Sequence, residues 1–354
     1  MQMLPSVDIV ILNYNGKKFL DECIQTVQQS TYTNKHIYLL DNASTHDDVA
    51  YIIANYPAVK VIQNPNNNGY CAAYNLALQF CTGDYIICLN NDVAVAPDWI
   101  ESMVELAESD EMIAAIQPKL ISYFDESEFE YAGASGGKMD VYGFPFLRGR
   151  VFDSIEKDNQ QYDNITQIFW ASGAALFMRK SALKHSGFFD ETIVHHMDEI
   201  DLCWRLRMAG YTLFVQPKSF IKHIGGATIQ TKSFKKIYWN HRNSIYIMLK
   251  NYNSKHAWKF VPVHVILDYV AVAYAIISLN FVMAGGILSA HFWLLSNIFL
   301  IKSKRKETQA IRKVGDEKIL PFLYRKSVVI EYFFKRNKTY STLTNIDLHE
   351  NINH

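Results

Sequence analysis

The chain has 354 residues, 49% of them hydrophobic, which is enough for one large core or for one core with an appendage. Lysine plus arginine and aspartate plus glutamate each total 35, so the formal net charge is zero. Nucleic-acid-binding proteins usually carry a basic excess, so this composition argues against nucleic acid as a partner. Five cysteines without CxxC spacing predict small core residues in a reducing compartment. The first apolar run has no basic segment before it, which favours a strand over a signal peptide.

Strand-like and helix-like segments alternate through the first third of the chain. Short apolar runs predict strands at 8–12, 37–40, 59–62 and 85–89. Apolar residues at helical spacing predict helices at 19–27, 49–53, 72–77 and 97–107, the last with Pro97 in its first turn. Farther along, strands are predicted at 168–179 and at 211–215, where Pro217 closes the second. The alternation predicts an α/β fold with a parallel sheet and helices on both faces.

Residues 119–166 interrupt this pattern. They lack regular periodicity and mix glycines with aromatic and charged residues. Long irregular segments inside compact domains are usually functional. We therefore expect a long loop or a β-excursion that lies over the site and recognises substrate.

Polar residues follow three of the predicted strands. Asn15, Asp41 and Asp92 each lie just past a strand end, and ligands of open α/β sheets bind beyond the carboxyl ends of the strands. The chain has neither a G-x-G-x-x-G motif after the first strand nor a P-loop, so a bound phosphate needs another counter-charge. Asp92 offers the hard oxygen ligand that Mg²⁺ or Mn²⁺ takes alongside phosphate oxygens, and His223 is a second candidate ligand.

The segment 197–210 carries the main catalytic signal. Its apolar residues have helical spacing, and Gly210 is placed to end the helix. Asp198, Glu199 and Asp201 crowd the first turn, where the electropositive helix start stabilises negative charge. A lone aspartate at such a position is usually a cap, whereas three acids beside two histidines favour a general base.

The C-terminal third combines basic, aromatic and apolar residues, a composition typical of surfaces that contact anionic lipid headgroups. The basic and aromatic residues are Lys235, Lys236, Lys250, Lys255, Lys259, Tyr238, Trp239 and Trp258. Residues 269–288 then run without a charge, close to the length that spans a bilayer, and a second apolar run covers 292–301. The alternatives are a membrane-associated surface, a true span, and a buried helical hairpin on the catalytic domain. The tail beyond Asn345 is polar and is expected to fray.

Short motifs occur in a fixed order along the first two thirds of the chain. They are Val-Ile-Leu-Asn-Tyr-Asn at 10–15, Asp-Asn-Ala-Ser at 41–44, Asn-Asn-Gly-Tyr at 67–70 with Asn75, Gly-Asp-Tyr at 83–85, Leu-Asn-Asn-Asp at 89–92, Gly173 with Phe189-Asp190, and Glu-Ile-Asp-Leu-Cys-Trp-Arg at 199–205. In this order the chain resembles the inverting glycosyltransferases of family 2, close to the rhamnosyltransferase-like members of bacterial polysaccharide pathways. The resemblance covers about residues 6–250. It implies the GT-A fold, a mostly parallel central sheet with helices on both faces, here followed by a C-terminal helical, membrane-associated segment.

The resemblance also implies roles for individual residues. Asp41 would contact the nucleotide base, Asn91 would lie next to the ribose and phosphates, and Asp92 would hold Mg²⁺ or Mn²⁺ on the donor diphosphate. Glu199 would be the catalytic base. The family usually shows Glu-Asp where this chain has Asp198-Glu199, so Asp198 and Asp201 stay candidates beside it. The implied donor site is Asn13, Tyr14, Asn15, Asp41, Asn68, Gly69, Asn75, Asn91 and Gly173, and the metal site is Asp92 with His223.

Together these features predict a metal-dependent inverting glycosyltransferase of cell-surface polysaccharide synthesis. The donor would be dTDP-rhamnose or a UDP-sugar, and the acceptor a glycan or a lipid-linked molecule. The alternatives are a nucleotidyltransferase with a similar sheet and a non-catalytic, membrane-bound sugar-nucleotide- or glycan-binding protein. We expect a catalytic domain at 1–230, a helical, membrane-associated region at 231–310, and a C-terminal helix with a polar tail at 311–354, at the cytoplasmic face of the bacterial inner membrane.

Overall fold

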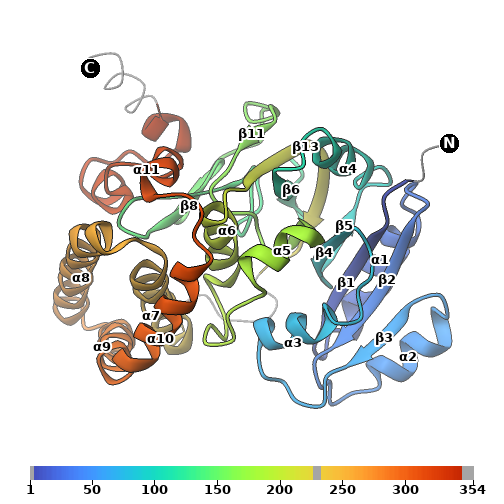
Figure 1. Ribbon diagram of the computed structural model, residues 1–354, viewed down its shortest axis with the longest axis horizontal. Helices are drawn as coiled ribbons and strands as arrows, with labels where there is room; N and C mark the ends of the chain where they lie inside the picture. Colours follow the sequence, from blue (N-terminus) through green and yellow to red (C-terminus); the bar gives the residue numbers. More distant parts are fainter. Residues whose placement is uncertain (1–3, 226–232, 345–354) are drawn as a thin grey trace.

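The computed structural model describes residues 4–225 and 233–344, and a mixed β-sheet flanked by helices forms its centre (Figure 1). Its first elements are β1 (Val7–Asn13), α1 (Lys17–Gln28), β2 (Lys35–Asp41), α2 (Asp48–Asn55), β3 (Lys60–Gln63), α3 (Tyr70–Ala77) and β4 (Tyr85–Asn90). Strands β4, β1, β2 and β3 are parallel neighbours in that order. The predicted alternation of strands and helices in this part of the chain is therefore confirmed.

The other half of the sheet is partly antiparallel. It comprises β5 (Val93–Val95), α4 (Glu101–Glu108), β6 (Ile113–Ser122), β11 (Thr166–Gln167), β12 (Ala175–Arg179), α5 (Lys180–Ser186), α6 (Asp198–Met208) and β13 (Thr212–His223). The order across the sheet is β11-β13-β6-β12-β4-β1-β2-β3, and β12 runs antiparallel to both β4 and β6. The sheet is thus mixed, where the alternation alone predicted parallel strands.

Two boundaries differ from the prediction in this half. Helix α4 begins at Glu101, and Pro97 lies in the turn before it. Strand β12 covers only Ala175–Arg179 of the predicted 168–179, because the backbone of Ile168 and Phe169 bonds to other segments of the chain. The residues before β12 therefore cross the core without joining the strand.

Strands β13 and β6 are longer than the sequence suggests. Strand β13 continues through Pro217 to His223, because its register with β6 shifts between Gln216 and Phe220. At such an irregularity a proline need not donate to the ladder. The prediction missed most of β6, whose Pro118 disfavours a central strand although its residues from Ile113 on are buried.

The expected β-excursion is shorter than the predicted 119–166, because 119–122 belong to β6 and Thr166 belongs to β11 of the central sheet. The strands β7 (Gly137–Met139), β8 (Pro145–Leu147), β9 (Arg150–Val151) and β10 (Ser154–Ile155) pair in the order β10-β9-β8-β7 as a second sheet. Phe146 and Val151 of this sheet pack against Tyr324 and Val328 from the C-terminal part of the chain. The excursion is therefore supported by residues far away in sequence, and its role in substrate recognition stays a prediction.

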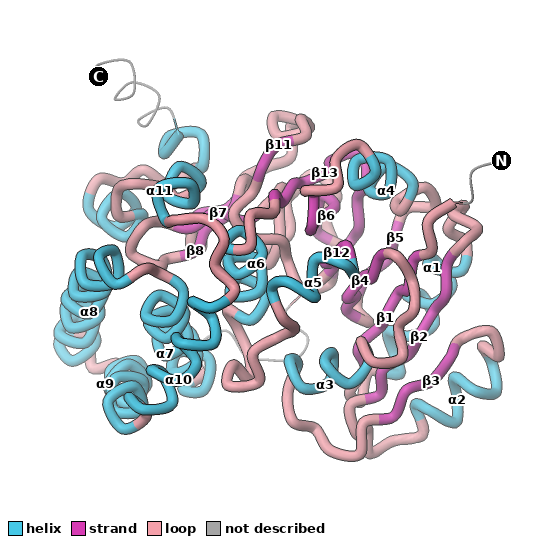
Figure 2. Tube along the Cα trace, viewed as in Figure 1, coloured by secondary structure: helices cyan, strands magenta, loops and turns pink. Residues whose placement is uncertain are grey.

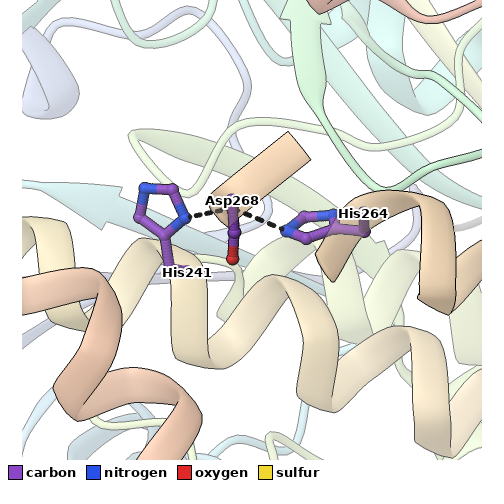
Figure 3. A group of neighbouring side chains, drawn as sticks. All are labelled: His241, His264 and Asp268. Carbon is purple, nitrogen blue, oxygen red and sulfur yellow. Dashed lines mark hydrogen bonds and ion pairs between the residues drawn. The ribbon is translucent and has the colours of Figure 1, made fainter. Parts of the chain in front are cut away.

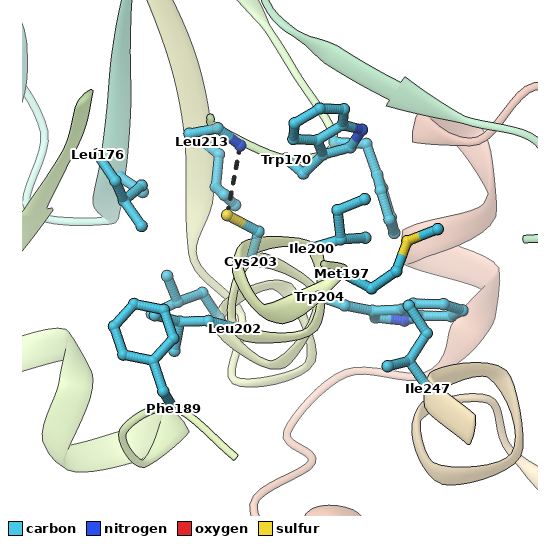
Figure 4. Close-up of a cluster of buried hydrophobic side chains, with 14 of the residues drawn as sticks. Trp170, Leu176, Phe189, Met197, Ile200, Leu202, Cys203, Trp204, Leu213 and Ile247 are labelled. Atoms are coloured by element: carbon cyan, nitrogen blue, oxygen red, sulfur yellow. Dashed lines mark hydrogen bonds between the residues drawn. The ribbon is translucent and has the colours of Figure 1, made fainter. Parts of the chain in front are cut away.

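The predicted helix at 197–210 is confirmed as α6, which lies in the middle of the molecule (Figure 1) and is buried on nearly every side. Figure 4 shows Leu202 beside Phe189, and Trp204 on the side of the helix that faces Ile247. Ring contacts of Trp204 with Phe169 and Tyr252 close the packing. All five cysteines are buried free thiols, as expected of small core residues.

The C-terminal helices pack together on one side of the central sheet (Figure 2). They are α7 (Phe234–Asn251), α8 (Ser254–Ile277), α9 (Phe281–Ser296) and α10 (Ile298–Ala310), followed by α11 (Asp316–Ile319), a 3₁₀ turn (Leu320–Phe322) and a π-helical turn (Ile330–Phe334). Ile247 and Met248 of α7 share one apolar cluster with α6, and so do Phe260 of α8, Leu294 of α9 and Ile301 of α10. The predicted boundary at 230/231 and the polar tail from 345 lie outside the described residues.

The uncharged run 269–288 is not one helix. Helix α8 ends at Ile277 and α9 begins at Phe281, because Leu279 takes a φ of +56° and Asn280 caps α9 by accepting a hydrogen bond from Met283 N. A single span over 269–288 is therefore wrong. By length and composition, α8 is the one described helix that could cross a membrane, and α9 with α10 forms a pair bent by 74°.

Helices α8, α9 and α10 expose a broad apolar face. Its largest exposed side chains are Trp258, Ile266, Tyr269, Tyr274, Ile277, Leu279, Phe281, Phe292, Leu295 and Phe299. In the most apolar stretch of α8, 28% of the residues are buried, unlike the core helix of a water-soluble protein. Lys250, predicted to lie on the lipid-facing surface, is instead buried in an ion-pair network.

Candidate active site

The Asn13 side chain joins the ends of three strands at the carboxyl edge of the sheet. It is fully buried at the end of β1, opposite Asp41 at the end of β2. Its Nδ2 donates to Asp48 Oδ2 at 2.9 Å, to Ser44 Oγ at 3.2 Å and to Asp41 Oδ1 at 3.3 Å. Its Oδ1 accepts a hydrogen bond from Asn91 Nδ2 at 2.8 Å, just past β4. The structure thus brings Asn13, Asp41 and Asn91 together.

Asn15 ties the loop after β1 to the loop after β2. Its backbone N–H donates to Ser44 Oγ at 2.9 Å, and its Oδ1 accepts from Thr45 N at 2.8 Å. The preceding Tyr14 is exposed. Asp41 Oδ2 accepts from Ser44 N at 3.1 Å. The two loops therefore form one fixed polar surface at this edge, with the Tyr14 ring on its outside.

The loop before α3 is fixed by amide side chains. Asn67 Oδ1 accepts from Asn42 Nδ2 at 2.9 Å and from Gly69 N at 3.3 Å, and Asn68 between them is exposed. Gly69 has a φ of +91°, and a Cβ there would lie 2.9 Å from Val194. Only glycine meets both conditions without strain. The loop thereby packs closely against the segment that leads into α6.

Asn75 and Gly173 hold the same region from the other side. Asn75 exchanges two hydrogen bonds of 3.0 Å with the backbone of Phe189, so it positions the chain before α6. Gly173 O accepts from Tyr70 OH at 3.3 Å, and its neighbour Ala174 accepts from the backbone N–H of Asn90. These contacts link the end of β4 to α3. Asn75 and Gly173 therefore support the site through the backbone of this region.

Asp92 and His223 meet as predicted. His223 Nε2 lies 3.1 Å from Asp92 Oδ1, and its Nδ1 lies 3.2 Å from Glu130 Oε1. All three side chains are buried. Burial alone would lower the pKa of His223, but its hydrogen bonds to both carboxylates raise that pKa to about 10. The same imidazolium lowers the pKa of Asp92 against the effect of burial. Sequence reasoning missed Glu130, because it lies outside the motifs, between the one at 89–92 and Gly173.

The start of α6 is unusual in its backbone. His196 and Met197 both have positive φ, +64° and +66°, directly before Asp198. Non-glycine residues in this region are strained and cluster at functional sites. Burial lowers the pKa of both neighbouring histidines, that of His196 to about 4, so they stay neutral at pH 7 and do not compensate the acids.

Glu199 is a carboxylate with a raised pKa at this helix start. It is half-buried, and Asp198 is buried beside it. Burial, and then the charge and hydrogen bond of Asp198, raise the pKa of Glu199 well above its usual value. Burial, and then nearby groups that include Asp198 and Glu199, raise the pKa of Tyr70. The Tyr70 hydroxyl donates to the backbone oxygen of Gly173. The two acids therefore adjoin the Gly173 region next to β4.

Asp201 points to another part of the molecule. It is fully buried, and its oxygens accept hydrogen bonds from Arg205 Nε at 2.9 Å, Lys250 Nζ at 2.9 Å and Asn251 Nδ2 at 3.0 Å. Lys250 also pairs with Asp190 at 2.5 Å. The structure thus separates Asp201 from Glu199 and binds it to α7.

Asn243 of α7 holds the strained turn in place. Its Nδ2 donates to His195 O at 2.7 Å and to His196 O at 2.9 Å. The neighbouring Arg242 donates to Thr192 O at 2.9 Å. Sequence reasoning missed both residues, because a polar residue inside a helix gives no local sign of a partner so far away in the chain.

Over residues 8–185, half of the chain, the sequence matches the family model described as glycosyl transferase family 2. It is 28% identical over 165 residues to the pre-mycofactocin glycosyltransferase of Mycobacterium tuberculosis, covering 47% of this chain and 32% of that protein. It is 25% identical over 237 residues to the N-acetylglucosaminyl-diphospho-decaprenol L-rhamnosyltransferase of the same organism, covering 62% and 76%. The chain thus spans about a third of the length of the first relative.

Solved structures share the fold at low sequence identity. GalNAc-T7 with UDP, GalNAc and Mn²⁺ gives a TM-score of 0.58 at 14% identity, covering 100% of this chain and 58% of that chain. The mannosyltransferase PcManGT from Pyrobaculum calidifontis with GDP-Man and Mn²⁺ gives 0.50 at 16% identity, covering 95% and 89%. These likenesses support the GT-A fold, and the family match selects the glycosyltransferase hypothesis over the nucleotidyltransferase one. The chain belongs to glycosyl transferase family 2.

Proposed function

We propose that this enzyme transfers rhamnose from dTDP-rhamnose, or another sugar from a UDP-sugar, to a glycan or lipid-linked acceptor, with inversion, in cell-surface polysaccharide synthesis. The observation that carries the proposal is the combination of a fixed polar edge at β1, β2 and β4 with a basic carboxylate at the start of α6. In support, one relative carries the name of an L-rhamnosyltransferase for a decaprenol-linked sugar. One structural neighbour was solved with UDP.

The donor nucleotide would bind at Asn13, Tyr14, Asn15 and Asp41. Uracil and thymine both present an N3–H donor, so a fixed carboxylate such as Asp41 suits either base. Asp41 is held by its hydrogen bonds from Asn13 and from Ser44 N. The remaining donor residues we propose are Asn68, Gly69, Asn75, Asn91 and Gly173, of which Asn75 and Gly173 act by fixing the surrounding backbone.

The side chains of Asp92 and His223 carry atoms that are suitable ligands for a divalent metal ion, Mg²⁺ or Mn²⁺. Asp92 offers carboxylate oxygen, His223 turns Nε2 toward the same oxygen, and Glu130 Oε1 lies 3.2 Å from Nδ1 of that histidine. Such an outer carboxylate orients a ligating histidine. His223 must lose its proton to ligate, so metal affinity should rise with pH. When bound, the ion neutralises the charge that builds on the leaving diphosphate.

Glu199 is the base in this proposal. Its carboxylate accepts the proton of the acceptor hydroxyl while that oxygen bonds to the anomeric carbon from the side opposite the leaving diphosphate. The bond to the diphosphate breaks in the same displacement, which inverts the anomeric configuration. A raised pKa makes Glu199 a stronger base than an exposed glutamate. Asp198 beside it is the alternative base, and Asp201 would fix α6 against α7.

Membrane association is the proposed use of the apolar face on α8, α9 and α10. Exposed apolar patches of this extent usually mark interaction sites. Lys302 and Lys306 follow the apolar start of α10 and are exposed, which suits anionic lipid headgroups. We therefore propose a location at the cytoplasmic face of the bacterial inner membrane, where a lipid-linked acceptor would be within reach. Co-flotation with anionic vesicles, compared with neutral vesicles, tests it.

Donor binding and turnover test the chemical assignment. The full chain is incubated with dTDP-rhamnose and UDP-sugars with and without Mn²⁺, and melting temperature and sugar-nucleotide consumption are measured. Glu199→Gln should keep donor stabilisation but lose about 10²- to 10⁴-fold in turnover. Asp92→Ala should lose the Mn²⁺-dependent part of the stabilisation, while Glu105→Gln, on exposed α4 surface, should behave like the parent. Parent-like turnover by Glu199→Gln with the right donor would refute the base assignment.

A further inference from the structure

Three histidines from three helices surround one buried aspartate in the C-terminal region. Asp268 of α8 has its Oδ1 2.7 Å from His241 Nδ1 of α7 and 3.6 Å from His264 Nε2 of α8. Its Oδ2 lies 2.8 Å from His291 Nε2 of α9. Asp268 and His264 are each 1% exposed. Figure 3 shows His241 and His264 turned toward Asp268 from opposite sides.

The hydrogen bond of His264 fixes which of its nitrogens faces Asp268 without a hydrogen. Nδ1 lies 2.5 Å from the backbone oxygen of Tyr142, and a carbonyl can only accept, so Nδ1 carries the hydrogen. Nε2 is buried and has no hydrogen-bond partner among residues 4–225 and 233–344. In the neutral ring it turns a lone pair toward the carboxylate. Two acceptors then face each other inside the protein, an arrangement that only a cation between them relieves.

The distance between His264 Nε2 and Asp268 Oδ1 favours a metal ion over a proton shared by these two atoms. A proton between Nε2 and Oδ1 would draw the two atoms to about 2.7–3.2 Å, the length of a hydrogen bond, whereas they are 3.6 Å apart. Four ligands at about 2.0 Å from a zinc ion lie about 3.3 Å from one another. The stacked ring of Phe144, 4.3 Å away, holds His264 in this orientation.

We propose that His241, His264 and Asp268 form a binding site for a zinc-class divalent metal. One ligand atom from each lies within 4.8 Å of the other two, and nitrogen with carboxylate oxygen is a donor set that Zn²⁺ takes. The fourth position is open to water. Metal binding replaces the hydrogen-bond proton between His241 Nδ1 and Asp268 Oδ1. His291 on Oδ2 and Tyr142 O on Nδ1 are the outer partners that orient the ligands.

The site would fix α7 against α8. His241 is on the same helix as Arg242 and Asn243, which bind the backbone of the segment before α6. A metal at His241 would therefore stabilise the helix that holds this strained turn. The metal site differs from Asp92 and His223 in elements and in ligands, and it does not depend on Glu199 being the base.

Metal uptake by the full chain tests the proposal. The Asp92→Ala protein serves as the parent here, and every further variant also carries this change, so that metal at the proposed donor site is removed. The chelator-stripped protein is titrated with Zn²⁺ and, for the visible spectrum of a four-coordinate ion, with Co²⁺, and bound metal is counted after dialysis. The parent should retain about one Zn²⁺ per chain and melt at a higher temperature with it. His264→Gln should retain none.

Two further variants separate the ligands from general packing. His291→Gln, which loses an outer partner, should keep the metal with affinity about 10- to 100-fold weaker. His256 is on α8, as His264 is, and His256→Gln breaks its 2.9 Å pair with Asp316 of α11, so this variant should bind metal like the parent. No stoichiometric Zn²⁺ on the parent would overturn the proposal, whatever the variants do. So would equal metal retention by His264→Gln and the His256→Gln control.

Discussion

Replacing Asn243 by leucine would test whether α7 positions the proposed base. Asn243 is fully buried and donates to His195 O at 2.7 Å and to His196 O at 2.9 Å. Each lost hydrogen bond removes about 0.5–1.5 kcal/mol, so the two hydrogen bonds together contribute about 1–3 kcal/mol. Leucine is close to asparagine in size, so the change removes the donors with little loss of packing, together with the Oδ1 that accepts from Arg242 Nε at 2.7 Å.

The strained turn before α6 then determines the consequence for activity. His196 and Met197 are both left-handed, and this conformation costs about 1–2 kcal/mol per non-glycine residue. The strain is thus comparable to the hydrogen-bond energy that opposes it. Without the two hydrogen bonds the turn should relax and carry Glu199 out of position. Because about 1.4 kcal/mol corresponds to a factor of ten, we expect kcat to fall about ten- to a hundredfold.

Steady-state kinetics and thermal unfolding of the full chain check this expectation. The donor site on β1 and β2 is not touched, so KM for the donor should change little while kcat falls. Ser244→Ala is the matched control, because Ser244 is buried on the same helix and donates to Gly143 O at 2.7 Å instead. It should lower the melting temperature to a similar or smaller degree and leave kcat unchanged. An unchanged kcat in Asn243→Leu, with a lower melting temperature, would refute the positioning role.

Three further changes follow from buried or strained groups. Lys250→Met leaves the buried Asp190 without its cation and Asp201 with Arg205 alone, and it should lower the free energy of unfolding by about 3–5 kcal/mol in chemical denaturation; no loss would mean that the network is solvated. Glu199→Gln should raise the melting temperature at neutral pH, because a carboxyl whose pKa is raised on folding destabilises the native state once pH exceeds its unfolded pKa of about 4.3. This gain should vanish as the pH falls to about 4, and a constant gain would contradict the assigned cause. Gly69→Ala should lose more than about 1 kcal/mol, because φ is +91° and the new Cβ would meet Val194. The control for this change is Gly285→Ala in α9, where the nearest atom to the new Cβ would be 3.5 Å away, and it should leave the free energy of unfolding unchanged or raise it.

The strands and helices that the sequence predicted correctly are those with a local pattern. The runs that became β1, β2 and β4 end in Asn13, Asp41 and Asn90, and parallel pairing then brings these ends to one edge. Strand β12 could not be oriented from its composition, because its antiparallel pairing with β4 and β6 depends on contacts between distant segments. Local periodicity identifies an element, whereas its neighbour and direction in the sheet are long-range properties.

The site residues divide in the same way. Asp92 and Glu199 belong to motifs, but Glu130, which holds His223, and Asn243, which holds the turn before α6, have partners far away in the chain. For Asp201 a signal was available. At about 100° per residue, Asp201 and Glu199 point about 160° apart on a helix, so both could not serve one site. The structure accordingly binds Asp201 to Lys250.

Directional contacts between α6 and α7 explain why so many polar groups are buried there. Apolar packing alone is non-directional and would allow α7 to slide along its neighbour, and buried ion pairs are weak evidence for stability in themselves. Asn243 binds the turn before α6, whereas Lys250 binds Asp201, one turn farther into the helix. Contacts at two heights fix the register of two helices, which a single contact cannot do. Because α7 also packs against α9, the apolar face on α8 to α10 has a fixed relation to Glu199. Attachment of that face to a membrane would then set the direction from which an acceptor hydroxyl approaches the base.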